Sequence, residues 1–374
     1  MEEISFNTDY KAILERVATI DPLNYARTRN FINGGVSYLS PYISRGVISL
    51  PEVARSALHN GPSAQSAEKF IQELAWREYY QQIWQARQAH IWQDLRHPQP
   101  DVQRTDMISA IAKANTGIIS IDEQINSLFI TGYMHNHVRM YLASITCNIA
   151  KAHWILPSKW MYYHLLDGDI ASNNCSWQWV AGAFANKKYY CNQENINMYT
   201  MSTQQGTFLD RPYEQLPEMP IPEILKEGIA IELITKLPNT SLPIIDTSRP
   251  TIIYNSYNLD PMWRKDQNAN RVLLLEPSHF DRFPVSEKVI GFIQDLSRNI
   301  PSIQIYAGEI AELQALYSQS GLATGQAFIS KDHPAFNHYP GTRDSYERIF
   351  PEVTGEYPSF FSYWKRCRKY LDNL

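Results

Sequence analysis

The feature that most constrains the fold is a change in hydrophobic period part-way along the 374-residue chain. Up to about residue 213, apolar residues recur at three- and four-residue spacing. This spacing is clearest in the segments 66–84, 106–114, 121–131, 135–153 and 159–166. It predicts helices with one buried face rather than strands. We therefore expect residues 1–213 to form an all-helical domain.

A different pattern follows a proline-rich stretch. Six prolines between residues 214 and 250 predict a linker with room for one short helix. After it, two buried strands (251–258 and 271–277), an amphipathic helix (285–299) and a third strand (303–308) are expected. Strand, helix and strand at this spacing predict a parallel unit. Residues 251–374 should thus form a smaller C-terminal α/β (Rossmann-like) domain.

Composition narrows the class of protein. There is no run of 18 apolar residues, and the acidic N-terminus lacks an apolar core, so we expect neither a membrane span nor a secretory signal. Four widely spaced cysteines without a CxxC pair indicate reduced thiols in a cytoplasmic protein and no metal site. The net charge of −4 neither shows nor excludes DNA binding, because a neutral domain can present a basic face.

A loop at residues 34–42, with the sequence GGVSYLSPY, is a candidate anion site. Ser40 is a favourable N-cap, and Pro41 suits a first helical turn. Two glycines would let a ligand approach the backbone, and Ser37, Ser40 and free N–H groups could hold a diphosphate. The alternative is an ordinary helix cap.

Charged and aromatic residues share helical faces further along. On one predicted helix the shared face carries Glu73, Trp76, Arg77 and Tyr80; on another it carries Asn136, Arg139 and Met140. The alternative for the first face is a partly exposed surface with an ion pair. Asp167 and Asp169 precede a helix that carries Asn173 and Trp177, and they could be caps. With Arg139 they could instead flank a flavin ring, where an amide and a cation stabilise particular redox states.

These blocks resemble a known family. GVSYLSPYISRGVIS, EKFIQELAWREYY, TGYMHNHVRMYLAS and HLLDGDIASNNCSWQW are similar, in order and approximate spacing, to the flavin domain of photolyases and cryptochromes. The similarity covers residues from about 22 to 213. It implies an all-helical domain that holds FAD in a folded, U-shaped form.

The resemblance also implies roles for individual residues. Positions matching cofactor contacts are Tyr25, Ser37, Leu39, Ser40, Arg77, Arg139, Asp167, Asp169 and Asn173, with Asn173 facing the flavin N5. Trp177 and Trp154 match the first two members of an electron-transfer chain. Positions matching the lesion pocket of dimer-repair enzymes are Glu73, Trp76, Asn136, Met140 and Trp179, and Glu73 counts among the catalytic residues. The (6-4) repair branch carries histidines in place of Asn136 and Met140.

The resemblance thus implies a blue-light-driven deoxyribodipyrimidine photolyase, whose partner is damaged DNA containing a pyrimidine dimer. The alternative is a cryptochrome-like photoreceptor without repair activity, whose signalling partner is unknown. In the enzyme, the dimer would flip out of the duplex into the pocket.

The chain also departs from the family pattern. Val36 replaces a hydroxyl residue in the phosphate loop, and residues 93–130 lack the third tryptophan, for which Trp92, Trp160 or a tyrosine could substitute. The stretch 187–200 replaces a common motif. Only about 20 residues precede the flavin domain, where the family carries an α/β antenna domain. The C-terminal α/β region loosely resembles part of that domain in transposed order; the alternative is an unrelated Rossmann-like domain.

Overall fold

The computed structural model describes residues 4–318 and 327–374, which divide into two compact units. The first unit consists mainly of Asp21–Val36 and Gln65–Glu232. The second combines Phe6–Ile20 and Ser37–Ala64 with the chain from Leu233 onward. Each unit is therefore built from segments that are far apart in sequence. The domain boundaries at residues 213 and 250 stay a prediction.

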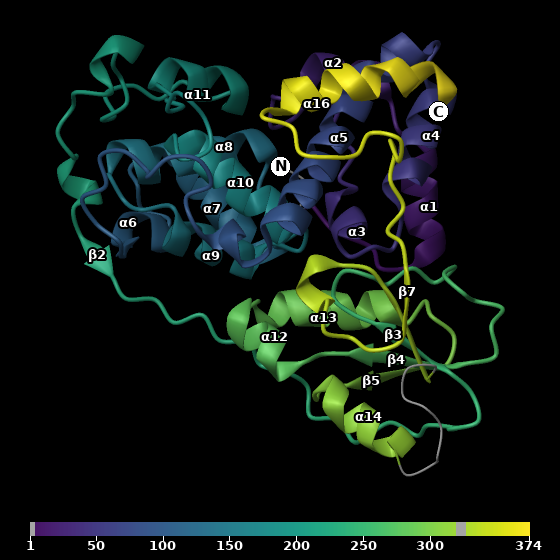
Figure 1. Cartoon of the computed structure of the whole chain (residues 1–374). Helices are drawn as coiled ribbons and strands as arrows, with labels where there is room; N and C mark the ends of the chain where they lie inside the picture. The colour runs from purple at the N-terminus through teal and green to yellow at the C-terminus, as the bar shows by residue number, and fades with distance from the viewer. Residues whose placement is uncertain (1–3, 319–326) are drawn as a thin grey trace. The chain divides into compact units, whose positions relative to one another are not determined.

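The first unit is helical and packs around one apolar core. Its helices are α2 (Pro22–Thr28), α5 (Ala64–Arg87), α6 (Ser109–Ala112), α7 (Ile119–Thr131), α8 (Asn136–Ser144), α9 (Ile155–His164), α10 (Ile170–Ala181) and α11 (Gln193–Thr200) (Figure 1). Fully buried side chains such as Ile125, Tyr141 and Trp154 fill the core. The helices predicted at 66–84, 121–131 and 159–166 are confirmed.

Two predicted helices differ from the structure. The segment 106–114 begins with a strand, β1 (Met107–Ile108), which pairs with β2 (Gly228–Ile229) and leaves only α6 helical. Asp106, beside β1, holds Arg104 at 2.7 Å, and a Cβ at Gly228 would lie 1.6 Å from the Asp106 carboxylate. Because Asp106 and Gly228 are 122 positions apart in the sequence, the hydrophobic period of either segment cannot predict this contact. The segment 135–153 is helical through α8 and then widens into a π-turn at Ile145–Ile149.

The second unit is built on a parallel sheet. Its strands are β3 (Thr251–Tyr254), β4 (Asn270–Leu274), β5 (Ile303–Tyr306), β6 (Phe328–Lys331) and β7 (Thr342–Asp344), in the order β5-β4-β3-β6-β7. From β3 the chain continues to β4 and then to β5 at one edge of the sheet. It then returns past β3 to form β6 and β7 on the other side. Because such crossovers are right-handed, α13 (Glu287–Ser297) and α14 (Ile310–Ser318) lie on opposite faces (Figure 1). The predicted strands, the helix and the parallel arrangement are confirmed.

Helices from both ends of the chain also belong to this unit: α1 (Tyr10–Ala18), α3 (Ser40–Ser44) and α4 (Leu50–Asn60) from the first part, and α16 (Phe360–Cys367) from the last. A short helix, α12 (Pro277–Arg282), lies between β4 and α13. The ring of Tyr42, on α3, lies 6.1 Å from that of Phe292 on α13. The Asn299 amide just after α13 donates to Thr8 O and accepts from Tyr10 N, at 2.7 and 2.9 Å. Helices predicted to belong with the first 213 residues therefore pack on the sheet domain.

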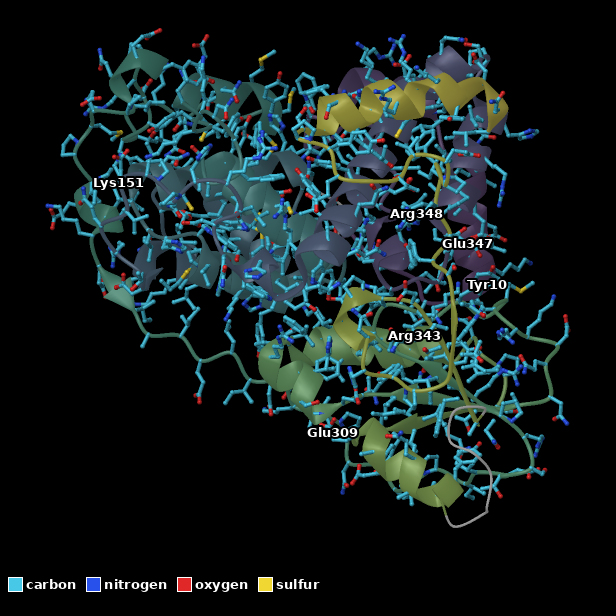
Figure 2. The ribbon with its side chains drawn as sticks, in the orientation of Figure 1. Tyr10, Lys151, Glu309, Arg343, Glu347 and Arg348 are labelled. Atoms are coloured by element: carbon cyan, nitrogen blue, oxygen red, sulfur yellow. The ribbon has the colours of Figure 1, made fainter. Side chains whose placement is uncertain are left out.

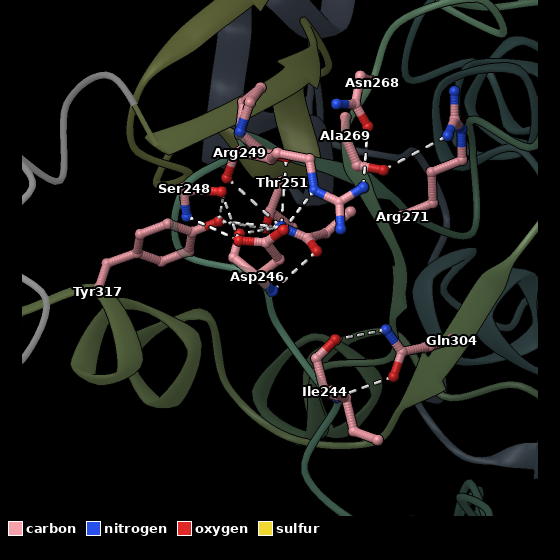
Figure 3. A network of polar contacts seen from close by, with 12 residues as sticks. Ile244, Asp246, Ser248, Arg249, Thr251, Asn268, Ala269, Arg271, Gln304 and Tyr317 are labelled. Atoms are coloured by element: carbon pink, nitrogen blue, oxygen red, sulfur yellow. Dashed lines mark hydrogen bonds and ion pairs between the residues drawn. The ribbon is translucent and has the colours of Figure 1, made fainter.

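A polar network fixes the segment that leads into the sheet (Figure 3). Asn270 Nδ2 donates to Asp246 O at 2.9 Å, and the Tyr317 hydroxyl donates to Arg249 O at 2.9 Å. The Thr251 hydroxyl lies 2.6 Å from that of Tyr317. The amino ends of β3 and β4 are thereby tied to α14 and to the chain before them.

Among the described residues, no helix combines the length and apolar character needed to cross a membrane. The four cysteines are buried, and none of them forms a disulfide. The cytoplasmic location stays a prediction.

The buried centre of the sheet should dominate the stability of the second unit. Ile253 on β3 is fully buried, so Ile253→Ala should lower the free energy of unfolding by about 2–5 kcal/mol. The matched control, Ile244→Ala, removes a side chain that is 86% exposed. It should change the free energy of unfolding by less than about 0.5 kcal/mol. Hydrogen exchange at the β4 amides, which pair with β3, measures this unit separately. Equal effects of the two substitutions would contradict the assignment of the core.

Candidate functional site

One carboxylate joins the two helices that carry most of the candidate residues. Asp169 caps α10 by accepting from Ser172 N at 2.7 Å, and Arg77 on α5 lies 3.5 Å from its other oxygen. Gln81, one turn beyond Arg77, donates to the same oxygen. Only 3% of the Asp169 side chain is exposed, and a buried carboxylate is tolerated when donors surround it. Capping, which was the alternative for Asp167 and Asp169, is thus confirmed for Asp169, whose contacts also fix α10 to α5.

A second ion pair stands just before α10. The Nη2 atom of Arg139 donates to both oxygens of Asp167, at 3.0 and 2.9 Å, and Nε donates to Met134 O at 2.8 Å. Its guanidinium also lies 5.4 Å from the centre of the Tyr133 ring. Arg139 thus holds a fixed, partly buried positive charge beside the start of α10.

Asn173 and Trp177 follow on α10. Asn173 Nδ2 donates to Ser158 O on α9 at 2.9 Å, which leaves its amide oxygen to accept a further hydrogen bond. Ser172 Oγ is buried and has no hydrogen-bond partner among the described residues. Trp177, one turn after Asn173, is only 2% exposed. A fixed amide, an unpaired buried hydroxyl and a nearby cation are the groups that a polar, ring-bearing cofactor requires.

Three tryptophans lie in the core of the first unit. Trp177, Trp154 and Trp160 belong to one buried apolar cluster. The Trp154 indole N–H donates to Asp94 at 2.7 Å, and Lys159, next to Trp160, lies 5.1 Å above the Trp92 ring. The structure therefore places both candidates for electron transfer in the same core.

Trp179 lies on another side of α10. It is 36% exposed, and its ring lies 5.6 Å from that of Tyr189. On α8, Asn136 is exposed, whereas Met140 packs partly against the core. Trp76 on α5 is half-buried and lies 5.3 Å from the Tyr80 ring. The helix α10 thus places the Trp177 ring in the interior and the Trp179 ring at the surface.

Glu73 lies on α5, and Tyr25, on α2, packs against Phe70 of the same helix. Oε1 of Glu73 contacts Lys69 at 2.8 Å and Arg29 at 3.5 Å, so the face carries the ion pair named as the alternative. Both contacts use one oxygen, and Oε2 remains to accept from a ligand. Tyr25 packs edge-on against Phe70 at 4.8 Å, and burial raises the pKa of its hydroxyl, which stays protonated.

Two histidines flank the start of α8 as neutral groups. Burial, with the neighbouring His137 and Arg139, lowers the pKa of His135 to about 4. Burial and Arg29 lower that of His137 to about 4 as well. Neither adds positive charge beside Arg139 near neutral pH. In the described part of the chain, no group of three His, Cys, Asp or Glu side chains is arranged to hold a metal.

Ser37, Leu39 and Ser40 belong to the second unit, whereas the other candidates belong to the first. The prediction that Ser40 caps a helix is wrong: α3 begins at Ser40, and Leu39 occupies the N-cap position without a side-chain bond. Tyr38 adopts a left-handed backbone with φ of 53°, and Leu39 already has helical angles, so the helix starts one residue early. Pro41 stands in the first turn as predicted.

The two glycines before this helix serve the chain itself. A Cβ at Gly34 would lie 2.0 Å from Thr28 O, and one at Gly35 would lie 2.4 Å from the Asn24 amide. Close packing against α2 therefore accounts for both glycines. They are not evidence for a ligand.

The sequence patterns missed three neighbours of the candidate residues. Gln81 follows Arg77 by four residues, so the helical face that carries Glu73 could have included it. Asp94 lies in an irregular segment after α5, and Tyr189 follows α10 in the stretch that departs from the family pattern. No local signal links either of them to the tryptophan that it contacts.

Comparison with known proteins agrees with this geometry. Residues 70–229 match the family model described as "FAD binding domain of DNA photolyase". The helical region is thus similar to the FAD-binding domain of photolyases. FAD is therefore the cofactor of this domain, and the donors and acceptors around Asn173 fit such a group.

Individual relatives cover part of the chain. A deoxyribodipyrimidine photo-lyase of Streptomyces griseus is 34% identical over 39% of this chain and 32% of its own length; one of Synechococcus is 33% identical over 43% and 35%. The chain thus spans about a third of the length of these photolyases. Among solved structures, a class III photolyase of Agrobacterium tumefaciens is 27% identical, with a TM-score of 0.42 over 47% of this chain and 38% of its own. A Synechocystis cryptochrome is 23% identical, with a TM-score of 0.48 over 60% and 49%.

The two roles of Asp169 can be separated by substitution. Asp169→Ala removes both the cap and the charge beside Arg77, whereas Asp169→Asn keeps a good capping acceptor. We expect the alanine variant to lose about 0.5–2 kcal/mol of stability through the cap alone, and the asparagine variant to lose less. Thermal unfolding of the FAD-loaded protein measures both. If alanine and asparagine destabilise equally, the cap contributes nothing.

Proposed function

We propose that this photolyase-family protein is a light-driven DNA repair enzyme that splits cyclobutane pyrimidine dimers in damaged DNA. The observation that carries the proposal is the arrangement of α10. Asn173 and the buried Trp177 fall on the side of the helix held by Ser158 and the core, while Trp179 is exposed on another side. A single helix can therefore serve a cofactor and a substrate at once.

The residues around the start of α10 would hold the cofactor. Reduced FAD, when bound, supplies on illumination the electron that opens the dimer and takes it back. Asn173, held by Ser158, would offer its amide oxygen to the flavin N5 region. Arg139, fixed by Asp167, would keep a positive charge near the ring. Tyr25, Ser37, Leu39, Ser40 and Arg77 are proposed as further cofactor contacts.

Trp177 and Trp154 would deliver electrons to oxidised cofactor. Both are buried in one apolar cluster, where little solvent must rearrange when charge moves. Asp94, which accepts from the Trp154 indole, would stabilise positive charge on that ring. Trp160 in the same cluster, and Trp92 beneath Lys159, are the candidates for the terminal donor.

The lesion would bind where α5, α8 and α10 carry exposed or half-buried groups. Trp76 and Trp179 would stack on the flipped bases, and Asn136 and Oε2 of Glu73 would pair with their edges. Met140 would form the floor. Asn136 and Met140 stand where the (6-4) branch carries histidines, which favours cyclobutane dimers as the lesion.

A photoreceptor without repair activity is the second candidate. It is favoured by the segment 187–200, which replaces a common family motif and supplies Tyr189, the ring next to Trp179. A tyrosine ring packed against a pocket residue would compete with a base for the same surface. The two candidates differ in one property: only the enzyme needs to prefer damaged DNA.

Removing the inner tryptophan should slow electron delivery. We expect Trp177→Phe to slow photoreduction of oxidised FAD by tenfold or more while FAD remains bound, because phenylalanine is much harder to oxidise than tryptophan. Trp263→Phe is the matched control, since Trp263 is buried in the second unit. Flavin absorbance under blue light is the measurement. Unchanged photoreduction in Trp177→Phe would mean that electrons enter by another route.

Removing the outer tryptophan should weaken lesion binding. Stacking on an aromatic ring is worth about 1–3 kcal/mol per base, so Trp179→Ala should weaken binding of dimer-containing duplex roughly ten- to a hundredfold. Glu73→Ala should lower repair as well, because a buried base edge loses its acceptor. Undamaged duplex should bind equally to wild type and both variants, since that binding rests on phosphate contacts. A wild-type protein without preference for damaged duplex would reject the repair proposal in favour of the photoreceptor.

A further inference from the structure

The indole of Trp154 has a single hydrogen-bond partner in the described part of the chain. Its Nε1–H donates to Asp94 Oδ1 at 2.7 Å, a short distance that is typical of a charged acceptor. Trp154 is fully buried, whereas 21% of the Asp94 side chain is exposed. Asp94 is therefore the group that connects this buried indole to solvent.

Gln99 holds both partners of this bond in place. Its backbone N–H donates to the other oxygen of Asp94 at 2.8 Å, and its Oε1 accepts from Trp154 N at 2.9 Å. Its Nε2 donates to Ala152 O at 2.9 Å, and the side chain is itself buried. The bond between Asp94 and Trp154 is thus fixed in advance. A base held within hydrogen-bond reach of a proton is the arrangement that proton transfer requires.

The chain before Trp154 is tied to the same stretch of sequence. Lys151, which Figure 2 labels, has a left-handed backbone with φ of 55°, and its carbonyl accepts from Gln103 N at 2.9 Å. Two residues later, His153 N donates to Arg104 O at 2.9 Å. Residues 151–154 therefore lie beside residues 99–104, and the backbone of Trp154 has little freedom to move away from Asp94.

His153 contributes to the position of the carboxylate but does not compete for the proton. Its Nε2 lies 3.6 Å from Asp94 Oδ1, too far for a hydrogen bond. Its Nδ1 accepts from Ile155 N at 3.4 Å, so a neutral imidazole carries its proton on Nε2, on the side of Asp94. Neither the neutral nor the charged ring offers a lone pair there. The indole proton can therefore pass to Asp94 alone.

The two candidates for a terminal donor have surroundings less suited to positive charge. The ammonium of Lys159 lies 5.1 Å above the Trp92 ring and opposes loss of an electron from that ring. Among the described residues, no carboxylate accepts a hydrogen bond from the indole of Trp160. Trp154 is the member of this group whose indole N–H meets an anion.

We propose that Asp94 accepts the indole proton of Trp154 when Trp154 gives up an electron, so that the charge stops at Trp154 as a neutral radical. Loss of an electron makes an indole N–H strongly acidic, and a positive charge in a buried site is costly. Trp154 passes one electron to oxidised Trp177, its Nε1–H bond breaks, and an O–H bond forms at Asp94 Oδ1. When Trp154 regains an electron, from the cofactor or from a thiolate in solution that becomes a thiyl radical, Asp94 returns the proton.

This step would prolong the separation of charge. A radical that has lost its proton attracts the departed electron less strongly than a radical cation does, so the electron returns more slowly. A chain of two tryptophans would then suffice, which accounts for the lack of a tryptophan in residues 93–130. The proposal rests on the proposed electron delivery through Trp177 and Trp154, and it does not depend on DNA repair.

The test is time-resolved absorption of the full-length protein, loaded with oxidised FAD, after a pulse of blue light. Cationic and neutral tryptophan radicals have different spectra, so the measurement follows loss of the proton directly. We expect wild type to form the neutral radical, more slowly in D₂O than in H₂O, and Trp154→Phe to form none. In Asp94→Asn, proton loss should be slower by about tenfold or more, because an amide accepts a hydrogen bond but is too weak a base to take the proton.

A matched control and the wild-type protein keep the test decisive. Glu123→Gln makes the same change from carboxylate to amide at an exposed position of the first unit and should behave as wild type. The FAD content and thermal unfolding of Asp94→Asn show whether its fold is intact, and the isotope effect in wild type requires no substitution.

Two kinds of failure can be distinguished. A wild-type radical that stays cationic, or a neutral radical that forms as fast in folded Asp94→Asn, would overturn the proposal and leave the electron route through Trp177 and Trp154 intact. A neutral radical that persists in Trp154→Phe would also overturn it. The absence of any tryptophan radical in wild type would overturn the electron route and this proposal together.

Discussion

The buried carboxylate of Asp169 is the contact on which the helical unit depends. It caps α10, meets Arg77 and accepts from Gln81, so one side chain sets both the start of α10 and its position against α5. Asn173, Trp177 and Trp179 follow at fixed offsets along a rigid helix, and their directions are therefore set by this one anchor. A small shift of α10 would misplace all three. Asp169 thus links the local signal of a helix cap to the geometry of the whole candidate site.

The second unit depends on a comparable anchor. Buried Arg45 holds the turn after β3, and Gly46 allows the chain to pass within contact distance of Tyr257 O. Residues Phe6–Ile20 and Ser37–Ala64 therefore form one compact unit with the chain from Leu233 onward. The helices α1, α3 and α4 would lose partners such as Phe292 and Asn299 if the sheet were removed. This physical dependence explains why the units interleave along the chain.

Much of the fold follows from periodicity alone. The positions of α5, β3, β4, β5 and α13 could be predicted because each carries a regular pattern of its own. Their partners could not. The pairing of β1 with β2 joins residues 120 positions apart, and the association of α3 with α13 is a tertiary contact that no local signal contains.

The candidate site likewise contains features that the sequence could predict and features that only the folded chain shows. The cap at Asp169 could be read from its place before a predicted helix, whereas the pairing of Arg139 with Asp167 is known only from the folded chain. Ser40 was misplaced because the left-handed backbone at Tyr38 starts the helix one residue early. Asp94 and Tyr189 lie in irregular segments, so only the folded chain shows that they contact Trp154 and Trp179.

The central claim is that this chain uses light to repair DNA. The most direct measurement is the loss of thymine dimers from a defined duplex, incubated with the purified protein and reduced FAD under blue light or in the dark. The account predicts dimer loss with many turnovers in the light and none in the dark. Dimers that persist in the light, in protein that is shown to contain reduced FAD, would contradict it.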